Sequence, residues 1–180
     1  GVMGIAADAT FLQSRMLNMG KGPAVHSLRV QTDRRKYHAY MKQLLEKTQN
    51  LEVKQAEITA VDIRDGAVCG VCTHLGGYYR ADAVIVATGT YLGGRIFVGE
   101  ASYASGPDGQ HAACALTESL RAAGVPLRRF KTGTPARVHR SSIDFSKLTR
   151  QPGDESIQPF SFLTKSEMKN KVDCYIAFTN

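Results

Sequence analysis

The spacing of apolar residues predicts two helices and a strand in the first third of the chain. GVMGIAADAT is typical of the end of a helix, FLQSRML of a short strand, and LNMGKGPAVHSLRVQTD of a loop punctuated by glycine and proline. A second helix should follow, capped by Thr32 or Asp33. Its apolar and aromatic residues recur at helical spacing and should face a core: Tyr37, Tyr40, Met41, Leu44 and Leu45. Basic residues should cover its solvent side: Arg35, Lys36, Lys42 and Lys47.

From residue 50 onward the period changes to that of β-strands. LEVKQAEITAVDI, GAVCGVCTHL and GYYRADAVIVATG read as three strands, with tight-turn signals at Asp65-Gly66 and Gly76-Gly77. These predict an antiparallel meander and a returning strand. The run VIVATGT, residues 84–90, is almost continuously apolar until it stops on small residues. Such a run is expected for a strand covered on both faces of a parallel sheet.

The second half of the chain reads as a mixture of connections and short elements. Residues 91–110 are expected to be a glycine-rich connection, followed by a helix from His111 to Ala123 that ends at Gly124. Leu116 and Leu120 should face inward from that helix. PLRRFKTGTPARV should be extended, SSIDFSKLTRQPGDESIQP turn-rich, and FSFL and DCYIAFT strands.

The end of the apolar run is the first candidate for a ligand site. In doubly wound sheets, ligands lie beyond the carboxyl ends of the parallel strands, and they approach the backbone where side chains are small. The small residues at this strand end are Ala87, Thr88, Gly89 and Thr90. The alternative is a strand that simply ends in a tight turn. GTYLGG differs in spacing from a GxGxxG phosphate-binding turn, which is expected upstream of Gly1.

Composition and charge narrow the possible functions. The chain of 180 residues is 43% hydrophobic and 22% charged, and no stretch approaches the 18 consecutive apolar residues of a membrane span. Both ends read as the middle of secondary-structure elements, so we expect an internal part of a longer chain. The net charge of 23 − 16 = +7 favours a polyanionic partner such as nucleic acid, or else a basic solvated surface.

The four cysteines are interpreted as small buried residues of a reduced, cytoplasmic protein. Cys69 and Cys72 form a CxxC pair, but within a strand pattern their side chains should point to opposite faces. A thioredoxin-type pair needs a helix N-terminus, and a zinc site needs a second ligand pair that His74 alone does not supply.

Several stretches, in this order, resemble the GidA or MnmG family: KGPAV, RVQTDRRKY, ATGTYLGGRIFVGE, SYASGPDG, RFKTGTPARV, SSIDFSKL, QPGDE, FSFL and CYIAFTN. The resemblance extends over essentially all of the chain, and KGPAV and KTGTPARV are its most specific motifs. It implies an α/β fold that is part of a Rossmann-like FAD-binding domain with an antiparallel β-meander, followed by the start of an inserted α+β region. The boundary should fall between residues 95 and 96.

The family resemblance also implies an activity. The family is the FAD-dependent large subunit of the enzyme that adds carboxymethylaminomethyl or aminomethyl groups to C5 of the tRNA wobble uridine. It implies FAD, with NADH and methylenetetrahydrofolate as cosubstrates, a GTPase subunit as partner, a homodimer, and a cytoplasmic location without membrane contact. The 180 residues alone are expected to be inactive and poorly soluble.

Residue roles carry over only at matching positions. The resemblance places Ile58 on the meander strand that contacts FAD, and Ala113 where some members have an FAD-contacting serine. It places Lys21, Gly22 and Pro23 near the flavin ring, or in a surface turn, and Ala87, Thr88, Gly89 and Thr90 at the strand end. Lys131 and Arg137 would face phosphate or form a solvated basic strand. None of the four cysteines matches the family's proposed catalytic cysteines, so no catalytic residue is assigned.

Two other functions remain open at this point. One is the related folate- and FAD-dependent tRNA uridine-5-methyltransferase, although KGPAV and the KTGTPARV–SSIDFSKL block argue against it. The other is a non-catalytic module that binds tRNA or a partner protein. Such a module would have no need for flavin, and its tRNA binding would be sensitive to salt.

Overall fold

The computed structural model describes residues 1–133, 135 and 137–178, in two compact units. The first unit comprises Gly1–Val53 and Pro135–Asn180, and the second comprises Lys54–Thr134. No helix among the described residues is long and apolar enough to cross a membrane.

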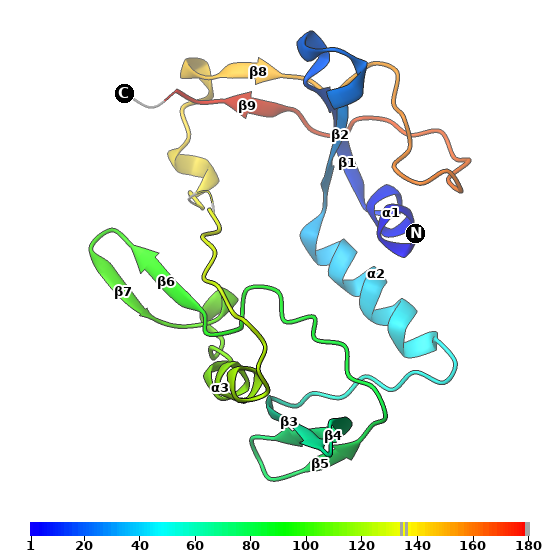
Figure 1. The fold of residues 1–180 in the computed structure, drawn as a ribbon. Helices are drawn as coiled ribbons and strands as arrows, with labels where there is room; N and C mark the ends of the chain where they lie inside the picture. The colour runs from blue at the N-terminus through cyan, green and yellow to red at the C-terminus, as the bar shows by residue number, and fades with distance from the viewer. Residues whose placement is uncertain (134, 136, 179–180) are drawn as a thin grey trace. The chain divides into compact units, whose positions relative to one another are not determined.

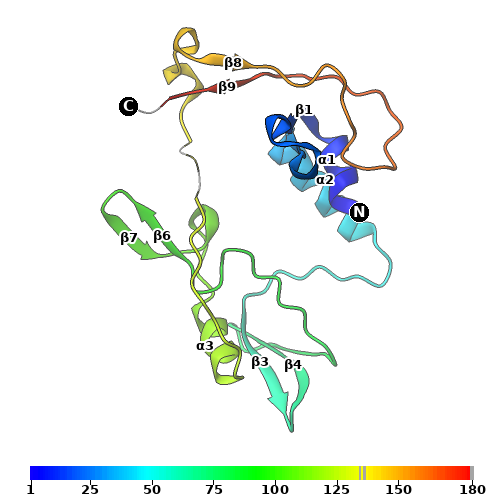
Figure 2. The same ribbon diagram turned by 45° about the horizontal axis from the view of Figure 1, so that its top comes forward.

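The first unit is built around the antiparallel hairpin of β1 and β2 (Figure 1). Its helices and strands are α1 (Val2–Ala9), β1 (Phe11–Leu17), β2 (Ser27–Thr32), α2 (Arg34–Lys47), β8 (Thr149–Gln151) and β9 (Cys174–Ile176), with short 3-10 turns at Met19–Lys21, Pro23–Val25, Arg140–Ser142 and Phe145–Lys147. β8 and β9 pair with each other in a second antiparallel hairpin (Figure 2). The sequence-based predictions of α1 and β1 are confirmed.

The prediction that residues 17–33 form only a loop is wrong, because β2 occupies the second half of that stretch. The alternation of Leu28 and Val30 with polar neighbours is the strand signal, and both side chains are half-buried. Pairing with β1 satisfies the backbone of this short segment. The glycine and proline residues of this stretch lie in the connection between β1 and β2.

Two stretches of the connection between β8 and β9, at Asp154 and at Asn170-Lys171, cover the remaining edge of β1. The Asp154 N–H donates to the Ser14 carbonyl at 2.9 Å, and the Lys171 N–H donates to the Leu12 carbonyl at 2.7 Å. The side-chain amide of Asn170 bridges the two stretches, accepting from the Ser14 N–H at 3.1 Å and donating to the Asp154 carbonyl at 2.8 Å. β1 is therefore held on both edges, and Ser14 is fully buried.

The helix α2 begins where the sequence predicted. Asp33 is its N-cap, and its carboxylate accepts from the backbone N–H groups of Arg35 and Lys36 at 3.0 and 3.1 Å. The predicted core-facing stripe is only half-buried, and no residue of the helix is fully buried. Leu45 remains 37% exposed, so α2 lies on the surface of this unit.

The second unit contains the predicted antiparallel meander. Its elements are β3 (Ile58–Arg64), β4 (Ala67–Thr73), β5 (Tyr78–Arg80), β6 (Arg95–Val98), β7 (Ala101–Ala104), a 3-10 turn at Pro107–Gly109, and α3 (Cys114–Ala122). Strands β3, β4 and β5 pair in sequence order. The predicted turns are confirmed by the positive φ angles of Asp65, Gly66 and Gly76, which are 51°, 76° and 81°.

Helix α3 packs on the meander through the side that the sequence indicated. Leu116 and Leu120 are each only 7% exposed, and the Ser119 hydroxyl accepts from the Val61 N–H at 3.1 Å. Gly124 follows the helix with a φ of 82°, as a glycine at this position should.

The expected parallel strand at residues 84–90 does not form. Among the described residues, no strand pairs with this run, and Ile85 is 92% exposed. A strand is defined by hydrogen bonds to a neighbour, so an apolar run without one stays irregular. Residues 51–57 likewise precede β3 without strand structure.

Three further predictions are corrected. Residues 95–104 are not a plain connection, because β6 and β7 form a hairpin around Gly99-Glu100, with Gly99 at φ 56°. FSFL forms no strand, whereas β8 lies in the stretch expected to be only turns. Of the last predicted strand, residues 174–176 form β9, and Thr179 lies outside the described residues.

The cysteines are less buried than expected. All four thiols are free; Cys114 is exposed and the other three are half-buried. Cys69 and Cys72 both lie on β4, as predicted, without a disulfide between them.

Candidate functional site

The glycine-rich turn that follows the apolar run is hydrogen-bonded to Ala113, the residue before α3. The Tyr91 N–H donates to the Thr88 carbonyl at 3.1 Å, and the Ala113 N–H donates to the Tyr91 carbonyl at 2.9 Å. The Gly93 N–H donates in return to the Ala113 carbonyl at 3.3 Å. Through these hydrogen bonds, the predicted strand end at Thr88 and the predicted cofactor position at Ala113 are both linked to Tyr91.

A second loop, residues 105–110, closes against this turn. The Gly106 N–H donates to the Gln110 carbonyl at 2.8 Å, and the Tyr91 hydroxyl donates to Oε1 of Gln110 at 2.9 Å. A Cβ at Gly94 would lie 2.6 Å from the Ser105 carbonyl oxygen, and a Cβ at Gly106 would lie 2.6 Å from the His111 carbonyl oxygen. Glycine is required at both positions by close backbone approach. We call residues 88–94 and 105–113 the glycine junction.

Ile58, the predicted contact on the meander, begins β3 in the same unit. Its neighbour Glu57 lies 3.7 Å from His111, measured from Oε2 to Nδ1, so this end of β3 is close to the glycine junction. Ile58 and Thr88 are half-buried. The other strand-end residues, Ala87, Gly89 and Thr90, are exposed, and Ala113 is half-buried.

The predicted flavin-ring loop belongs to the other unit. Lys21, Gly22 and Pro23 lie in the connection between β1 and β2, where Asn18 donates from Nδ2 to the Val25 carbonyl at 3.2 Å. Gly22 has a φ of 92°, a conformation that favours glycine. Backbone hydrogen bonds within the loop, such as that from the Lys21 N–H to the Asn18 carbonyl at 2.9 Å, add to the contact of Asn18 with Val25, and Lys21 is exposed.

The remaining predicted positions have less support. Lys131 and Arg137 are both exposed, and their motif neighbours Thr134 and Ala136 lie outside the described residues. In the described part of the chain, no group of histidine, cysteine, aspartate and glutamate could hold a metal ion.

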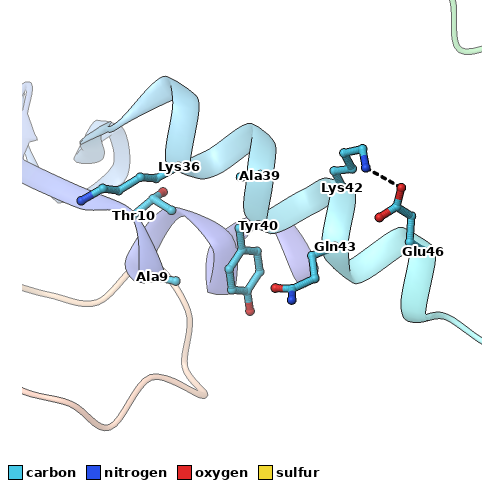
Figure 3. Close-up of a pocket in the computed structure, with 8 residues that line it drawn as sticks. All are labelled: Ala9, Thr10, Lys36, Ala39, Tyr40, Lys42, Gln43 and Glu46. Atoms are coloured by element: carbon cyan, nitrogen blue, oxygen red, sulfur yellow. Dashed lines mark hydrogen bonds and ion pairs between the residues drawn. The ribbon is translucent and has the colours of Figure 1, made fainter.

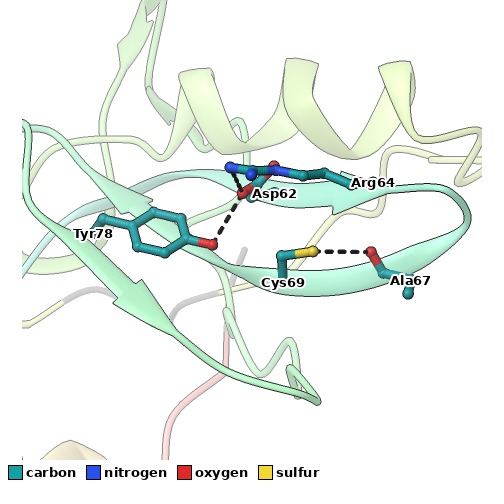
Figure 4. Close-up of polar contacts among 5 residues, drawn as sticks. All are labelled: Asp62, Arg64, Ala67, Cys69 and Tyr78. Atoms are coloured by element: carbon teal, nitrogen blue, oxygen red, sulfur yellow. Dashed lines mark hydrogen bonds and ion pairs between the residues drawn. The ribbon is translucent and has the colours of Figure 1, made fainter.

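Sequence reasoning missed a polar cluster on the meander (Figure 4). Asp62 accepts from Nη2 of Arg64 at 2.8 Å and from the Tyr78 hydroxyl at 3.0 Å. The hydrogen bond from Arg64 holds the pKa of Asp62 below its usual value, with Tyr78 acting in the same direction. Partial desolvation raises the pKa of Tyr78, and its hydrogen bond to Asp62 adds to that shift. Residues 62 and 64 share a strand face, which was the available signal.

A hollow of about 510 Å³ lies beside α2 (Figure 3). Its lining residues are Ala9, Thr10, Lys36, Ala39, Tyr40, Lys42, Gln43 and Glu46. Lys42 is paired with Glu46 at 2.6 Å, one turn further along the helix. The hollow therefore offers polar groups but no arrangement of side chains that indicates a reaction.

Comparison with known proteins gives a consistent result for the whole chain. The family described as glucose inhibited division protein A matches residues 1–180. A tRNA uridine 5-carboxymethylaminomethyl modification enzyme MnmG of Clostridium kluyveri is 51% identical over 180 residues, covering 99% of this chain and 29% of that protein. The protein of the same name from Caldicellulosiruptor saccharolyticus is 54% identical over 179 residues, again covering 99% of this chain and 29% of its own length.

A solved structure confirms the fold class. Aquifex aeolicus GidA, in its form I crystal, matches with a TM-score of 0.87 and 41% sequence identity, over 97% of this chain and 30% of that chain. The predicted α/β class, with an antiparallel meander, is therefore confirmed. The chain spans about 29% of the length of the curated relatives that it matches.

Proposed function

Since this chain belongs to the glucose inhibited division protein A family, we propose that the protein carrying it modifies C5 of the wobble uridine of tRNA. The modification would be a carboxymethylaminomethyl or aminomethyl group. The observation that carries this proposal is the identity of 51% to 54%, over essentially the whole chain, with relatives named for that modification.

FAD is the proposed cofactor, and the glycine junction with Ile58 is its proposed site. What supports this is a stretch of small residues, Ala87 to Thr90, in which all but the half-buried Thr88 are exposed and Gly89 has a φ of 53°. A nucleotide can approach such a backbone closely. When bound, the flavin would supply the redox chemistry. The residues of the second unit proposed to hold it are Ile58, Ala87, Thr88, Gly89, Thr90 and Ala113. For Lys21, Gly22 and Pro23 of the first unit, a role toward the flavin is proposed from the family resemblance alone.

The proposed role of this chain is to position groups, and no residue of it is assigned a chemical step. Thr88 and Ala113 are tied to Tyr91 by backbone hydrogen bonds, so the exposed turn keeps a fixed relation to α3. The proposed domain boundary stays between residues 95 and 96, with an FAD-binding part before it and an inserted region after it.

The remaining parts of the proposal concern the whole protein. NADH and methylenetetrahydrofolate would be cosubstrates, a GTPase subunit the partner, and a cytoplasmic homodimer the active form. The net charge of +7 supports tRNA as substrate, because phosphate contacts dominate affinity for nucleic acids.

The test is complementation in a strain from which the gene has been deleted, with mass spectrometry of nucleosides from purified tRNA. The modified wobble uridine should disappear on deletion and return with the gene. Loss of 5-methyluridine instead would assign the methyltransferase function. A purified protein that binds tRNA in a salt-dependent manner without any flavin, and whose deletion changes neither nucleoside, would be a binding module.

A further inference from the structure

Two arginines stand directly opposite each other in the β1–β2 hairpin. Arg15 on β1 and Arg29 on β2 are register partners, so their side chains share one face. Like charges in this arrangement destabilise a strand pair. A compensating negative group is therefore expected beside them.

The structure gives both guanidinium groups neutral partners instead. Arg15 donates from Nη1 to the Pro152 carbonyl at 2.6 Å, and Arg29 donates from Nη2 to Oε1 of Gln151 at 3.0 Å. Both arginines are half-buried. A carbonyl and an amide orient the two side chains, but neither cancels their charge.

Within the described residues, no carboxylate forms an ion pair with either arginine. Asp154, two residues past Pro152, uses Oδ2 to accept from the Met16 N–H at 2.6 Å. In addition, Nε of Arg29 is buried and has no hydrogen-bond partner in the described part of the chain. A buried donor without a partner is costly, especially on a charged group.

We propose that Arg15 and Arg29 together bind an oxyanion, namely a phosphate group, on this face of the hairpin. Two guanidinium groups present planar arrays of N–H donors that match phosphate oxygens, and the anion would neutralise the cross-strand repulsion. The segment at Gln151 and Pro152 holds both side chains in place before the ligand arrives. The phosphate belongs either to the RNA backbone or to a nucleotide cofactor, a choice that rests on the proposed function.

The first experiment uses inorganic phosphate as the probe, with the complete gene product that carries this sequence. Thermal melting is followed against phosphate concentration at constant ionic strength, with chloride as the reference anion. Arg15→Gln and Arg29→Gln should each weaken the apparent phosphate affinity by about tenfold or more. Arg35→Gln, an equal loss of charge at an exposed site on α2, should retain the phosphate effect.

Loss of the arginine contacts could prevent folding, so the lysine variants provide a second measurement. Arg15→Lys and Arg29→Lys keep the charge but lose the planar donor array, and phosphate should bind them more weakly than the wild type. The proposal would be overturned if the glutamine variants fold and bind phosphate as the wild type does. If the glutamine variants do not fold, the same result with the lysine variants would overturn it.

Two further readouts identify the source of the phosphate. If the phosphate belongs to RNA, the Arg15 and Arg29 variants should bind tRNA more weakly and keep a normal flavin content. The slope of log binding constant against log salt concentration should fall by about 1. If the phosphate belongs to a nucleotide cofactor, the same variants should have a reduced flavin content and normal tRNA binding. The inorganic phosphate result does not depend on uridine modification, so failure of the proposed function and failure of this site are distinguishable.

Discussion

Replacing Gly106 with alanine should destabilise the glycine junction through packing alone. The φ and ψ of Gly106 are −82° and −178°, an extended backbone that any residue adopts. However, an added Cβ would lie 2.6 Å from the His111 carbonyl oxygen and 2.7 Å from Cδ1 of Tyr91. Both distances are shorter than real Cβ contacts, so the surroundings must move.

The two obstacles differ in how they can respond. The His111 oxygen is backbone and can move only with the start of α3, whereas the Tyr91 ring can rotate if it gives up its 2.9 Å hydrogen bond to Gln110. Overpacking typically costs about 1–3 kcal/mol. The lost hydrogen bond adds about 0.5–1.5 kcal/mol. In a large domain, each kcal/mol lowers the melting temperature by about 2–4 °C.

Thermal melting of the complete gene product, with flavin content measured in parallel, checks this prediction. Gly106→Ala should lower the melting temperature and, if FAD binds at the glycine junction, also the flavin content. Gly20→Ala is the matched control, because a Cβ there meets nothing within 4 Å and its φ is not in the positive region. It should change stability by no more than about 0.5 kcal/mol. Equal melting temperatures for the two variants would refute the packing argument.

Three further predictions concern other contacts. Asn170→Ala should lower the free energy of unfolding by about 1–3 kcal/mol, measured by urea denaturation, because it leaves the N–H of the buried Ser14 and the carbonyl of the half-buried Asp154 unpaired; an unchanged midpoint would contradict the bridging role. Asp33→Ala should cost about 0.5–2 kcal/mol by removing the cap of α2, and Asp33→Asn should recover most of it; equal loss in both would exclude capping. Because Arg64 and Tyr78 depress the pKa of Asp62, its stabilising contribution is present above the ordinary value of 3.8 and is lost as pH falls through the lower folded value. Asp62→Asn should flatten this acid limb of a pH-dependent melting series, and an unaltered limb would count against the cluster.

The sequence predicted those elements whose signals are local. The cap at Asp33, the turns at Asp65-Gly66 and Gly76, and the inward face of α3 each depend on a few consecutive residues, and the structure has all of them. Turn chemistry and helical spacing act within one or two turns of chain. The meander could therefore be predicted with its connections.

The predictions failed where structure depends on a distant partner. Residues 84–90 read as a buried strand, yet whether they form one depends on a neighbour that no local pattern supplies. Conversely, β2 and β8 are short strands whose partners stabilise them. The bridge made by Asn170 to β1 spans 156 residues and has no sequence signature.

The same reasoning explains why the candidate sites were only partly visible. Gly89 has a positive φ of 53°, and turn chemistry can indicate such a glycine. Gly106 is required by the approach of a backbone oxygen and an aromatic ring from elsewhere in the chain, which only the folded structure shows. Likewise, no sequence pattern indicates that Arg15 and Arg29 are neighbours, because only the register of the hairpin places them side by side. Sites made from backbone approach and cross-strand pairing must therefore be sought in the structure, whereas sites made from turn residues can be found from the sequence.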